Sequence, residues 1–242
     1  MKVIITKDYE ELSEKAFEIM REVVLAKHDA VLGLATGSTP LGLYKKMVED
    51  HLQNGTSYRD MRAVNLDEYV GLSPENDQSY RYFMRKNLFD AIDIDLANTH
   101  IENGLAADKE AECARYNALL ALFPRDIQLL GIGANGHIAF NEPGTPFDSE
   151  THVVSLTENT IEMNARFFKN KDEVPKQAFT MGIKNITDAR KVLILACGAN
   201  KAKAVFGLVR GAVTEDLPAS ILQKHNDCIL IADREAAALL GE

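Results

Sequence analysis

Short apolar runs alternate with helical patterns along this chain, and that alternation constrains its fold more than any other feature. A run that is apolar throughout is typical of a strand in a parallel sheet with both faces covered. The sequence therefore predicts a single α/β domain over residues 1–242, with a modified doubly wound (Rossmann-like), mostly parallel sheet and helices on both faces. The predicted strands are 30–34, 61–66, 127–132, 152–156, 192–196 and 228–232.

Apolar residues at helical spacing fill most of the intervals between these strands. Asp8 to Glu11 resembles a capping box at the start of a first helix, and Pro40 suits the first position of a second. Two segments, 135–150 and 169–176, follow neither pattern and are predicted to be irregular. The other predicted helices are 78–88, 107–120, 159–168 and 200–209.

Composition and charge exclude several classes of protein. Hydrophobic residues make up 46% and charged residues 26% of the chain, which is ordinary for a globular domain and excludes disorder and coiled coils. The formal net charge of −9 argues against a large surface for nucleic acid or anionic membrane. No apolar run approaches the roughly 18 residues of a membrane span, and the N-terminus lacks a secretory pattern.

The cysteines indicate a reducing compartment. Cys113, Cys197 and Cys228 are odd in number and far apart, and they form no Cys-x-x-Cys pair. Neither a disulfide framework nor a zinc site is therefore expected. We expect a cytoplasmic protein that binds no metal, nucleic acid or membrane.

Ligands of doubly wound sheets bind beyond the carboxyl ends of the strands, so residues there are the first candidates for a site. Gly37, Ser38 and Thr39 follow the strand 30–34 and lead into a helix. Backbone N–H groups and the helix dipole at such a turn suit a phosphate. An ordinary capped turn explains the same residues equally well.

A pair of carboxylates follows the strand 61–66. Asp67 or Glu68 could supply a general base there. Acidic residues are common at the ends of strands, where they cap loops, and this alternative is favoured when the pair is taken alone.

Residues 131–136 form a Gly-x-Gly-x-x-Gly sequence after a predicted strand, as in dinucleotide-binding proteins. That motif requires a helix to begin at its third glycine. Pro143, Gly144 and Pro146 follow too closely to leave room for a crossover helix. The match is therefore predicted to be misleading, and the segment to be a bent loop.

What remains of this loop is a polar cluster of Asn135, His137, Asn141 and Glu142. A histidine with a nearby carboxylate is a workable proton-transfer pair near neutral pH. A histidine in a loop is more often structural or solvated, although one flanked by glycines and carboxamides is less easily explained in that way.

Two cations complete the set of candidates. Lys201 begins the helix predicted over 200–209, and Arg166 lies near the end of the one over 159–168. A lysine in the first turn opposes the helix dipole unless an anion binds beside it. Each cation taken alone is better explained as a solvated charge.

Five separated segments together resemble the glucosamine-6-phosphate deaminase family, in its short form, nearly from end to end. They are 32–40 (LGLATGSTP), 65–69 (NLDEY), 136–143 (GHIAFNEP), 164–168 (NARFF) and 198–201 (GANK). The resemblance implies the doubly wound fold predicted above. It also implies a hydrolase of amino-sugar catabolism that converts glucosamine 6-phosphate and water to fructose 6-phosphate and ammonia, without a metal or redox cofactor.

The resemblance also implies catalytic roles. Asp67 corresponds to the base that takes the C2 proton of the opened sugar and returns it to C1. His137 corresponds to the acid–base group that opens the ring, oriented by Glu142. Asn135 stands where some family members have aspartate. An asparagine can orient the imidazole through its carbonyl group but does not stabilise imidazolium as a carboxylate does.

A phosphate site is implied by the same comparison of motifs. Gly37, Ser38, Thr39, Arg166 and Lys201 stand at its positions. An isomerisation that moves a proton between C1 and C2 gains from such a distant anchor, because the anchor converts binding energy into orientation.

Two rival functions stay open at the level of sequence. A 6-phosphogluconolactonase shares the fold and the glycine-rich loop with its histidine, but lactone hydrolysis leaves Asn141-Glu142-Pro143 and Asp67-Glu68-Tyr69 unexplained. A non-catalytic sugar-phosphate sensor would keep the phosphate loop, lose the base and carry a DNA-binding module. We expect the deaminase.

Regulation by a second sugar phosphate is not expected. Larger members of the family are hexamers that N-acetylglucosamine 6-phosphate activates through basic residues after the Asn-Glu-Pro motif and a C-terminal extension. Residues 151–155 contain no lysine or arginine here, and the sequence stops at Glu242, soon after the final predicted strand. The prediction is a monomer or small homo-oligomer with hyperbolic kinetics, since a phosphorylated effector needs a cation to bind it.

Overall fold

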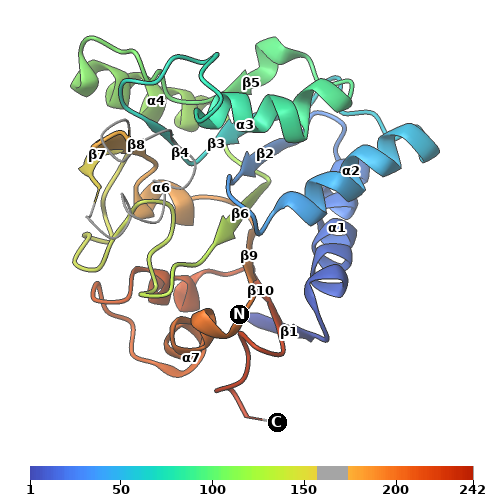
Figure 1. The fold of residues 1–242 in the computed structure, drawn as a ribbon, viewed down its shortest axis with the longest axis vertical. Coiled ribbons are helices and arrows are strands. Elements are labelled where there is room, and N and C mark those ends of the chain that lie inside the picture. Colours follow the sequence, from blue (N-terminus) through green and yellow to red (C-terminus); the bar gives the residue numbers. More distant parts are fainter. Residues whose placement is uncertain (157–173, 242) are drawn as a thin grey trace.

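The computed structural model describes residues 1–156 and 174–241, and its centre is a seven-stranded sheet in the order β1-β10-β9-β6-β2-β3-β5 (Figure 1). Every pair of neighbouring strands in this sheet is parallel. The predicted α/β fold with a doubly wound sheet is confirmed. The strands are β1 (Lys2–Thr6), β2 (Val31–Leu34), β3 (Arg62–Asn65), β5 (Thr99–His100), β6 (Ile127–Gly131), β9 (Val192–Ala196) and β10 (Cys228–Asp233).

The strands that the sequence predicted best lie inside the sheet. The bounds of β2, β3, β6, β9 and β10 agree with the predicted runs within one residue at each end. Their side chains are almost all buried, so the continuous apolar pattern is the direct trace of a sheet covered on both faces. The two strands that were not predicted, β1 and β5, are the edges, where exposure or shortness weakens the pattern.

A second, three-stranded sheet was not predicted. Its order is β4 (Asp67–Tyr69), β8 (Gln177–Thr180) and β7 (His152–Ser155), and both pairs are antiparallel. The predicted strand at 152–156 therefore exists but belongs to this sheet. β4 and β8 are too short and too polar to stand out in the sequence.

Helices cover the sheet on both sides: Figure 1 shows α1 and α2 together on one side, and α6 and α7 on the other. None of the helices in the described residues is long and apolar enough to cross a membrane. The predicted helix at 159–168 lies outside the described residues. The helices are α1 (Tyr9–Ala26), α2 (Leu41–Asn54), α3 (Tyr80–Asn87), α4 (Lys109–Leu122), α6 (Ile183–Thr187) and α7 (Ala202–Arg210), with the 3₁₀ turns η1 (Phe89–Ala91), η2 (Leu96–Asn98), η4 (Ala199–Lys201) and η5 (Pro218–Lys224).

The ends of the helices follow the predicted signals with small corrections. Asp8 caps α1 by accepting the N–H of Glu11, while the Glu11 side chain accepts the N–H of Lys7 rather than that of the cap residue. Pro40 is the cap of α2 and not its first residue. Lys201 likewise precedes α7, which begins at Ala202, because the 3₁₀ turn η4 comes first.

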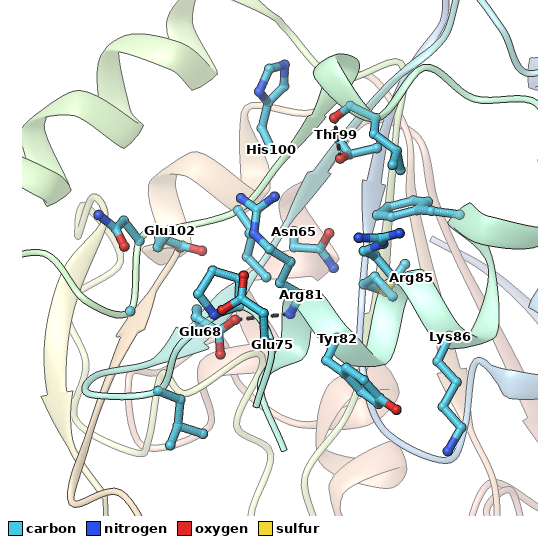
Figure 2. Close-up of a pocket in the computed structure, with 18 of the residues that line it drawn as sticks. Asn65, Glu68, Glu75, Arg81, Tyr82, Arg85, Lys86, Thr99, His100 and Glu102 are labelled. Carbon is cyan, nitrogen blue, oxygen red and sulfur yellow. Dashed lines mark hydrogen bonds between the residues drawn. The ribbon is translucent and has the colours of Figure 1, made fainter. Parts of the chain in front are cut away.

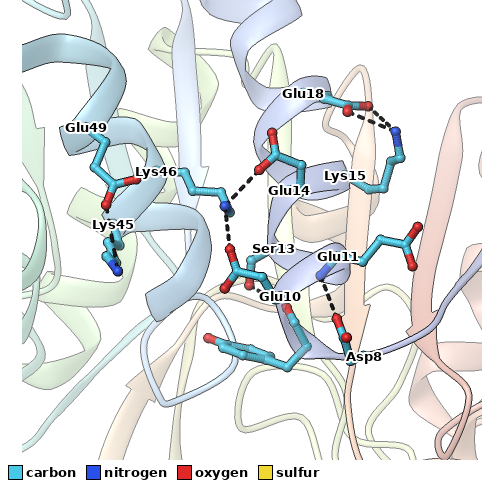
Figure 3. A network of polar contacts seen from close by, with 11 residues as sticks. Asp8, Glu10, Glu11, Ser13, Glu14, Lys15, Glu18, Lys45, Lys46 and Glu49 are labelled. Atoms are coloured by element: carbon cyan, nitrogen blue, oxygen red, sulfur yellow. Dashed lines mark hydrogen bonds and ion pairs between the residues drawn. The ribbon is translucent and has the colours of Figure 1, made fainter. Parts of the chain in front are cut away.

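Helices α1 and α2 are joined by both a polar network and close packing. Lys46 on α2 lies 2.7 Å from carboxylate oxygens of both Glu10 and Glu14 on α1 (Figure 3). Both carboxylates are exposed, and ion pairs with exposed partners stabilise a fold only slightly. Tight packing is more demanding: a Cβ atom on Gly42 would lie 2.1 Å from the hydroxyl oxygen of Ser13.

The centre of the sheet has a similar constraint at Gly33 in β2. A Cβ atom there would lie 2.2 Å from the side-chain oxygen of Gln128, a fully buried residue on the neighbouring strand β6. The Gln128 amide donates to the carbonyl oxygen of Leu129, so it is not free to move away. At Gly131, also in β6, a Cβ atom would have no described atom within 4 Å.

We predict that Gly33→Ala lowers the free energy of unfolding by roughly 1–3 kcal/mol, because the added methyl group overpacks a buried site. Gly131→Ala is the matched control, and it should leave that free energy unchanged or raise it by up to about 1 kcal/mol. Urea unfolding of both variants measures the difference. Equal stabilities of the two variants would contradict the packing argument.

Candidate active site

The candidate residues follow four neighbouring strands of the large sheet. Lys201 comes after β9, His137 after β6, Gly37 after β2 and Asp67 after β3, and these strands are adjacent in that order. The strand order reverses direction between β6 and β2, and a doubly wound sheet binds its ligands at such a switch point. The fold therefore brings these segments to one edge of the sheet.

The turn after β2 is exposed at Gly37 and Ser38, and its backbone is held by Tyr9 of α1. Gly37 has a φ of +95°, which favours glycine, and Ser38 beside it is exposed. The hydroxyl of Tyr9 lies 3.1 and 3.0 Å from the carbonyl oxygens of Ser38 and Thr39 and accepts the N–H of Gly42. The backbone of the turn is thus held by α1, while Ser38 stays exposed. Tyr9 was not predicted, because nothing local in the sequence connects it with this turn.

Asp67 is a buried carboxyl group in β4, where it pairs with Thr180 of β8. Burial, together with the charge of Glu68, raises the pKa of Asp67 to about 8. An ionised Asp67 is therefore a stronger base than an ordinary carboxylate, and its pKa lies near the pH at which a general base works best.

Aromatic rings surround this part of β4. The hydroxyl groups of Tyr80 and Tyr69 lie 3.3 Å apart, and the ring of Tyr80 stacks on that of Phe140 with a centroid distance of 6.3 Å. Burial and the nearby Tyr69 and Asp67 raise the pKa of Tyr80. Asp67 itself is 7% exposed. These rings come from three distant segments, so the sequence alone did not bring them together.

Glu68 has a structural role that the sequence left undecided. Its carboxylate accepts the backbone N–H groups of Tyr69, Tyr80 and Arg81 at 2.8–3.0 Å. Two of these belong to the first turn of α3, whose dipole also favours an acidic group there. Glu68 therefore fixes β4 to the beginning of α3, on the opposite face of the strand from Asp67.

The loop after β6 contains the predicted proton-transfer pair. An oxygen of Glu142 lies 3.2 Å from Nδ1 of His137, and this contact lowers the pKa of Glu142, with help from Asn135. A Cβ atom on Gly133 would lie 2.5 Å from the imidazole ring, so the glycine gives the ring its place. No helix starts at Gly136, and the dinucleotide motif is misleading, as predicted.

Asn135 acts differently from the expectation. Its amide group donates to Glu142 at 2.6 Å, and its carbonyl oxygen accepts the backbone N–H of His137 rather than a hydrogen from the ring. Asn135 therefore holds the Glu142 carboxylate and the backbone of the loop. Of Asn135 and Glu142, only Glu142 contacts the imidazole ring.

Asn141 fastens the same loop to the smaller sheet. It is fully buried, and its amide group donates to the carbonyl oxygens of Ile138 and Met181 at 2.9 Å. The N–H of Phe140 is bonded to the hydroxyl of Thr180, the residue that pairs with Asp67. Ala139, between them, has a φ of 53°, which is strained for a residue other than glycine. The loop of His137 and the strand of Asp67 are in this way parts of one hydrogen-bonded unit.

Lys201 is the cation that the structure places at this edge. It is half-buried, and burial lowers its pKa. It follows Gly198, whose φ of 93° turns the chain and whose N–H is bonded to the carboxylate of Asp233. An anion beside Lys201 would offset the cost of burying its charge. Arg166, the other predicted cation, lies outside the described residues.

Comparison with known proteins fits this arrangement. Residues 7–231 match the family model of glucosamine-6-phosphate isomerases/6-phosphogluconolactonase. A protein of Geobacillus sp. (strain WCH70) named glucosamine-6-phosphate deaminase is 54% identical, over 100% of this chain and 97% of its own length. A solved structure of a monomeric glucosamine-6-phosphate deaminase, called a missing link of the NagB superfamily, is 49% identical with a TM-score of 0.96, over 99% of this chain and 100% of its own.

A more distant structure shows a likeness of fold. The 6-phosphogluconolactonase of Trypanosoma cruzi has a TM-score of 0.81 at 24% identity, over 100% of this chain and 97% of its own. The match of the family model over almost the whole sequence, and the high identity to the deaminases, lead to one conclusion. The chain belongs to the family of glucosamine-6-phosphate isomerases and 6-phosphogluconolactonases.

Proposed function

We propose that this chain converts glucosamine 6-phosphate and water to fructose 6-phosphate and ammonia, as an enzyme of amino-sugar catabolism. Relatives that are 54% and 49% identical to this chain over nearly their whole length are named glucosamine-6-phosphate deaminases. Within the site, the observation that carries the proposal is the buried carboxyl of Asp67 beside the loop of His137 and Glu142. Hydrolysis of a lactone needs no base at C2 of the sugar, so a lactonase would leave Asp67 without a task.

Ring opening is the first step, and we assign it to His137. The imidazole moves a proton from the C1 hydroxyl group to the ring oxygen, which yields the open aldehyde. Glu142, held 3.2 Å from Nδ1, orients the ring. Because Asn135 donates to the same carboxylate, it supports His137 through Glu142 and not by direct contact with the imidazole.

Isomerisation and loss of ammonia follow. Asp67 takes the proton from C2, which gives an enolamine, and returns the proton to C1. The resulting imine at C2 adds water, and ammonia leaves as the ketone of fructose 6-phosphate forms. The raised pKa of Asp67 suits both halves of this transfer, since the same group must accept a proton and then give it back.

The phosphate of the substrate is assigned to the turn of Gly37, Ser38 and Thr39, to Lys201 and to Arg166. Of these, the described residues lie beyond β2 and β9, on the two sides of β6. A dianion held there leaves C1 and C2 to reach toward the residues after β6 and β3.

We further propose that residues 1–242 form one such catalytic domain, working in the cytoplasm as a monomer or small homo-oligomer with hyperbolic kinetics. The solved relative is described as monomeric. Residues 151–155, which contain no lysine or arginine, lie mostly in β7, and the absence of a cation there disfavours a phosphorylated activator.

The test of the reaction is direct. Purified protein mixed with glucosamine 6-phosphate should release ammonia and fructose 6-phosphate in equal amounts, measured together in one sample. The same protein should not hydrolyse 6-phosphogluconolactone above its spontaneous rate. Lactone hydrolysis without ammonia release would replace the proposed function with its rival.

We predict that Asp67→Asn reduces turnover by a factor of about 10²–10⁴ or more, because the general base is lost. Exchange of the C2 hydrogen with solvent deuterium measures the step itself. Asp60→Asn, an exposed aspartate nearby in sequence, is the control and should exchange at the parent rate. If Asp67→Asn also exchanges at the parent rate, Asp67 is not the base.

The same substitution should stabilise the fold. The pKa of Asp67 is about 8 in the folded protein, against about 3.9 when unfolded, so the folded state binds this proton more tightly. The parent therefore loses stability relative to Asp67→Asn as the pH rises from about 4 to about 8. Unfolding midpoints of the two proteins at pH 5 and pH 8 should diverge, with the variant the more stable at pH 8.

We predict that Lys201→Ala raises KM by roughly 10- to 100-fold and changes kcat much less, because a charge-assisted contact to the phosphate is lost. Inorganic phosphate should compete with the substrate for the parent protein and bind the variant more weakly. Lys203→Ala, an exposed lysine on α7, is the control. An unchanged KM in Lys201→Ala would remove this lysine from the phosphate site.

A further inference from the structure

A cavity of about 800 Å³ lies between α3, β5 and the segments 72–75 and 101–104 (Figure 2). Glu68 lines it, whereas Asp67, the neighbouring residue of β4, does not. Because successive side chains of a strand point to opposite faces, this cavity is separated from the candidate active site by β4 itself. None of the described residues assigned to the reaction above lines it.

Two buried polar groups on the cavity wall lack hydrogen-bond partners in the described part of the chain. Glu102 is 2% exposed, and neither oxygen of its carboxyl group has a hydrogen-bond partner among the described residues. The same is true of Nε2 of His100, whose ring stacks on Phe123 at a centroid distance of 5.6 Å. A buried polar group without a hydrogen bond is unfavourable. The ring of His100 packs on Phe123, outside the cavity lining, so Glu102 is the group that a bound molecule would complete.

Arg81 supplies a cation to the same space. Figure 2 shows the Arg81 side chain between Glu102 and Asn65, with the ring of His100 directed away from it. The guanidinium group of Arg81 forms no ion pair or side-chain hydrogen bond in residues 1–156 and 174–241, although it is close enough to contribute to lowering the pKa of His100. Its planar set of donors suits a carboxylate or phosphate.

The other charges on the wall are already engaged or lie outside. Arg85 pairs with Asp90 at 2.9 Å, and Lys86 lies over the ring of Tyr82. The carboxylate of Glu68 is bound by three backbone N–H groups, and Glu75 is exposed. Among the described residues of this wall, Arg81 is thus the charge left for a ligand.

We propose that this cavity is a second ligand site for a small anionic polyol. The molecule would place one carboxylate or phosphate group on Arg81 and a hydroxyl group on Glu102. Burial and the neighbouring Asp67, Glu68 and Glu112 raise the pKa of Glu102. A neutral carboxyl group bonds to hydroxyl groups without repelling the anion on Arg81. The site does not depend on the reaction assigned to the opposite face of β4.

Calorimetric titration of Lys201→Ala tests the proposal, because that background weakens binding at the candidate active site. The probes are gluconate and glycerol 3-phosphate, which combine an anion with hydroxyl groups, acetate, which has the anion alone, and sorbitol, which has the hydroxyl groups alone. At least one of the first two should bind one site about tenfold or more tightly than acetate and sorbitol. Which of the two binds more tightly identifies the anion as carboxylate or phosphate.

Two added substitutions locate the site. Arg81→Met and Glu102→Leu should each weaken the binding of the better probe about tenfold or more, while Lys45→Met, which removes an exposed lysine of α2, should not. Glu102→Leu replaces an unpartnered buried carboxyl with an apolar group, so its thermal midpoint should not fall. Binding of no probe, equal binding of all four, or binding that both Arg81→Met and Glu102→Leu leave unchanged would overturn the proposal.

Discussion

The strands of the large sheet are all parallel. Each connection between consecutive strands must therefore carry the chain from the carboxyl end of one strand back to the amino end of the next. The connections contain helices, two of them together with strands of the smaller sheet, and the helices cover both faces. The strands in the interior are therefore apolar at nearly every position. The carboxyl ends of the strands are left as the edge where loops are free to vary. The order reverses between β6 and β2, and the loops on either side of that point separate to leave room for a ligand.

The parallel sheet alone does not supply the base. Asp67 belongs to β4, which leaves the large sheet after β3 and pairs instead with β8. Hydrogen bonds from Asn141 and Phe140 attach the loop of His137 to the short antiparallel sheet and the residue after it. On its other side, Glu68 ties it to α3. The two adjacent acidic residues thus have different roles. Asp67 is buried and is the candidate base, whereas Glu68 accepts backbone N–H groups and fixes the position of β4.

Sequence patterns were sufficient where a structural cause is local. The five residues of β9 are all apolar and were predicted with their bounds, and Asp8 was recognised as a cap because its partner Glu11 is three residues away. The family motifs supplied the candidate residues in the same way. β4 was missed because only its pairing with Gln177–Thr180 makes it a strand. The unpartnered state of Glu102, the support of Tyr9 and the true contact of Asn135 likewise depend on packing between distant segments, which no local pattern encodes.

The position of β1 as an outermost strand of the large sheet has a consequence during synthesis of the chain. β1 pairs only with β10 within this sheet, so the strand of this sheet that is synthesised earliest has its sole neighbour there in Cys228–Asp233 (Figure 1). At translation rates of roughly 5–20 residues per second, β1 waits on the order of tens of seconds for that neighbour to leave the ribosome. During this time its unpaired N–H and C=O groups are open to other chains, and the half-exposed Ile5 adds an apolar surface. The polar and charged residues at the ends of this strand, Lys2 and Thr6, are then a protection for the nascent chain.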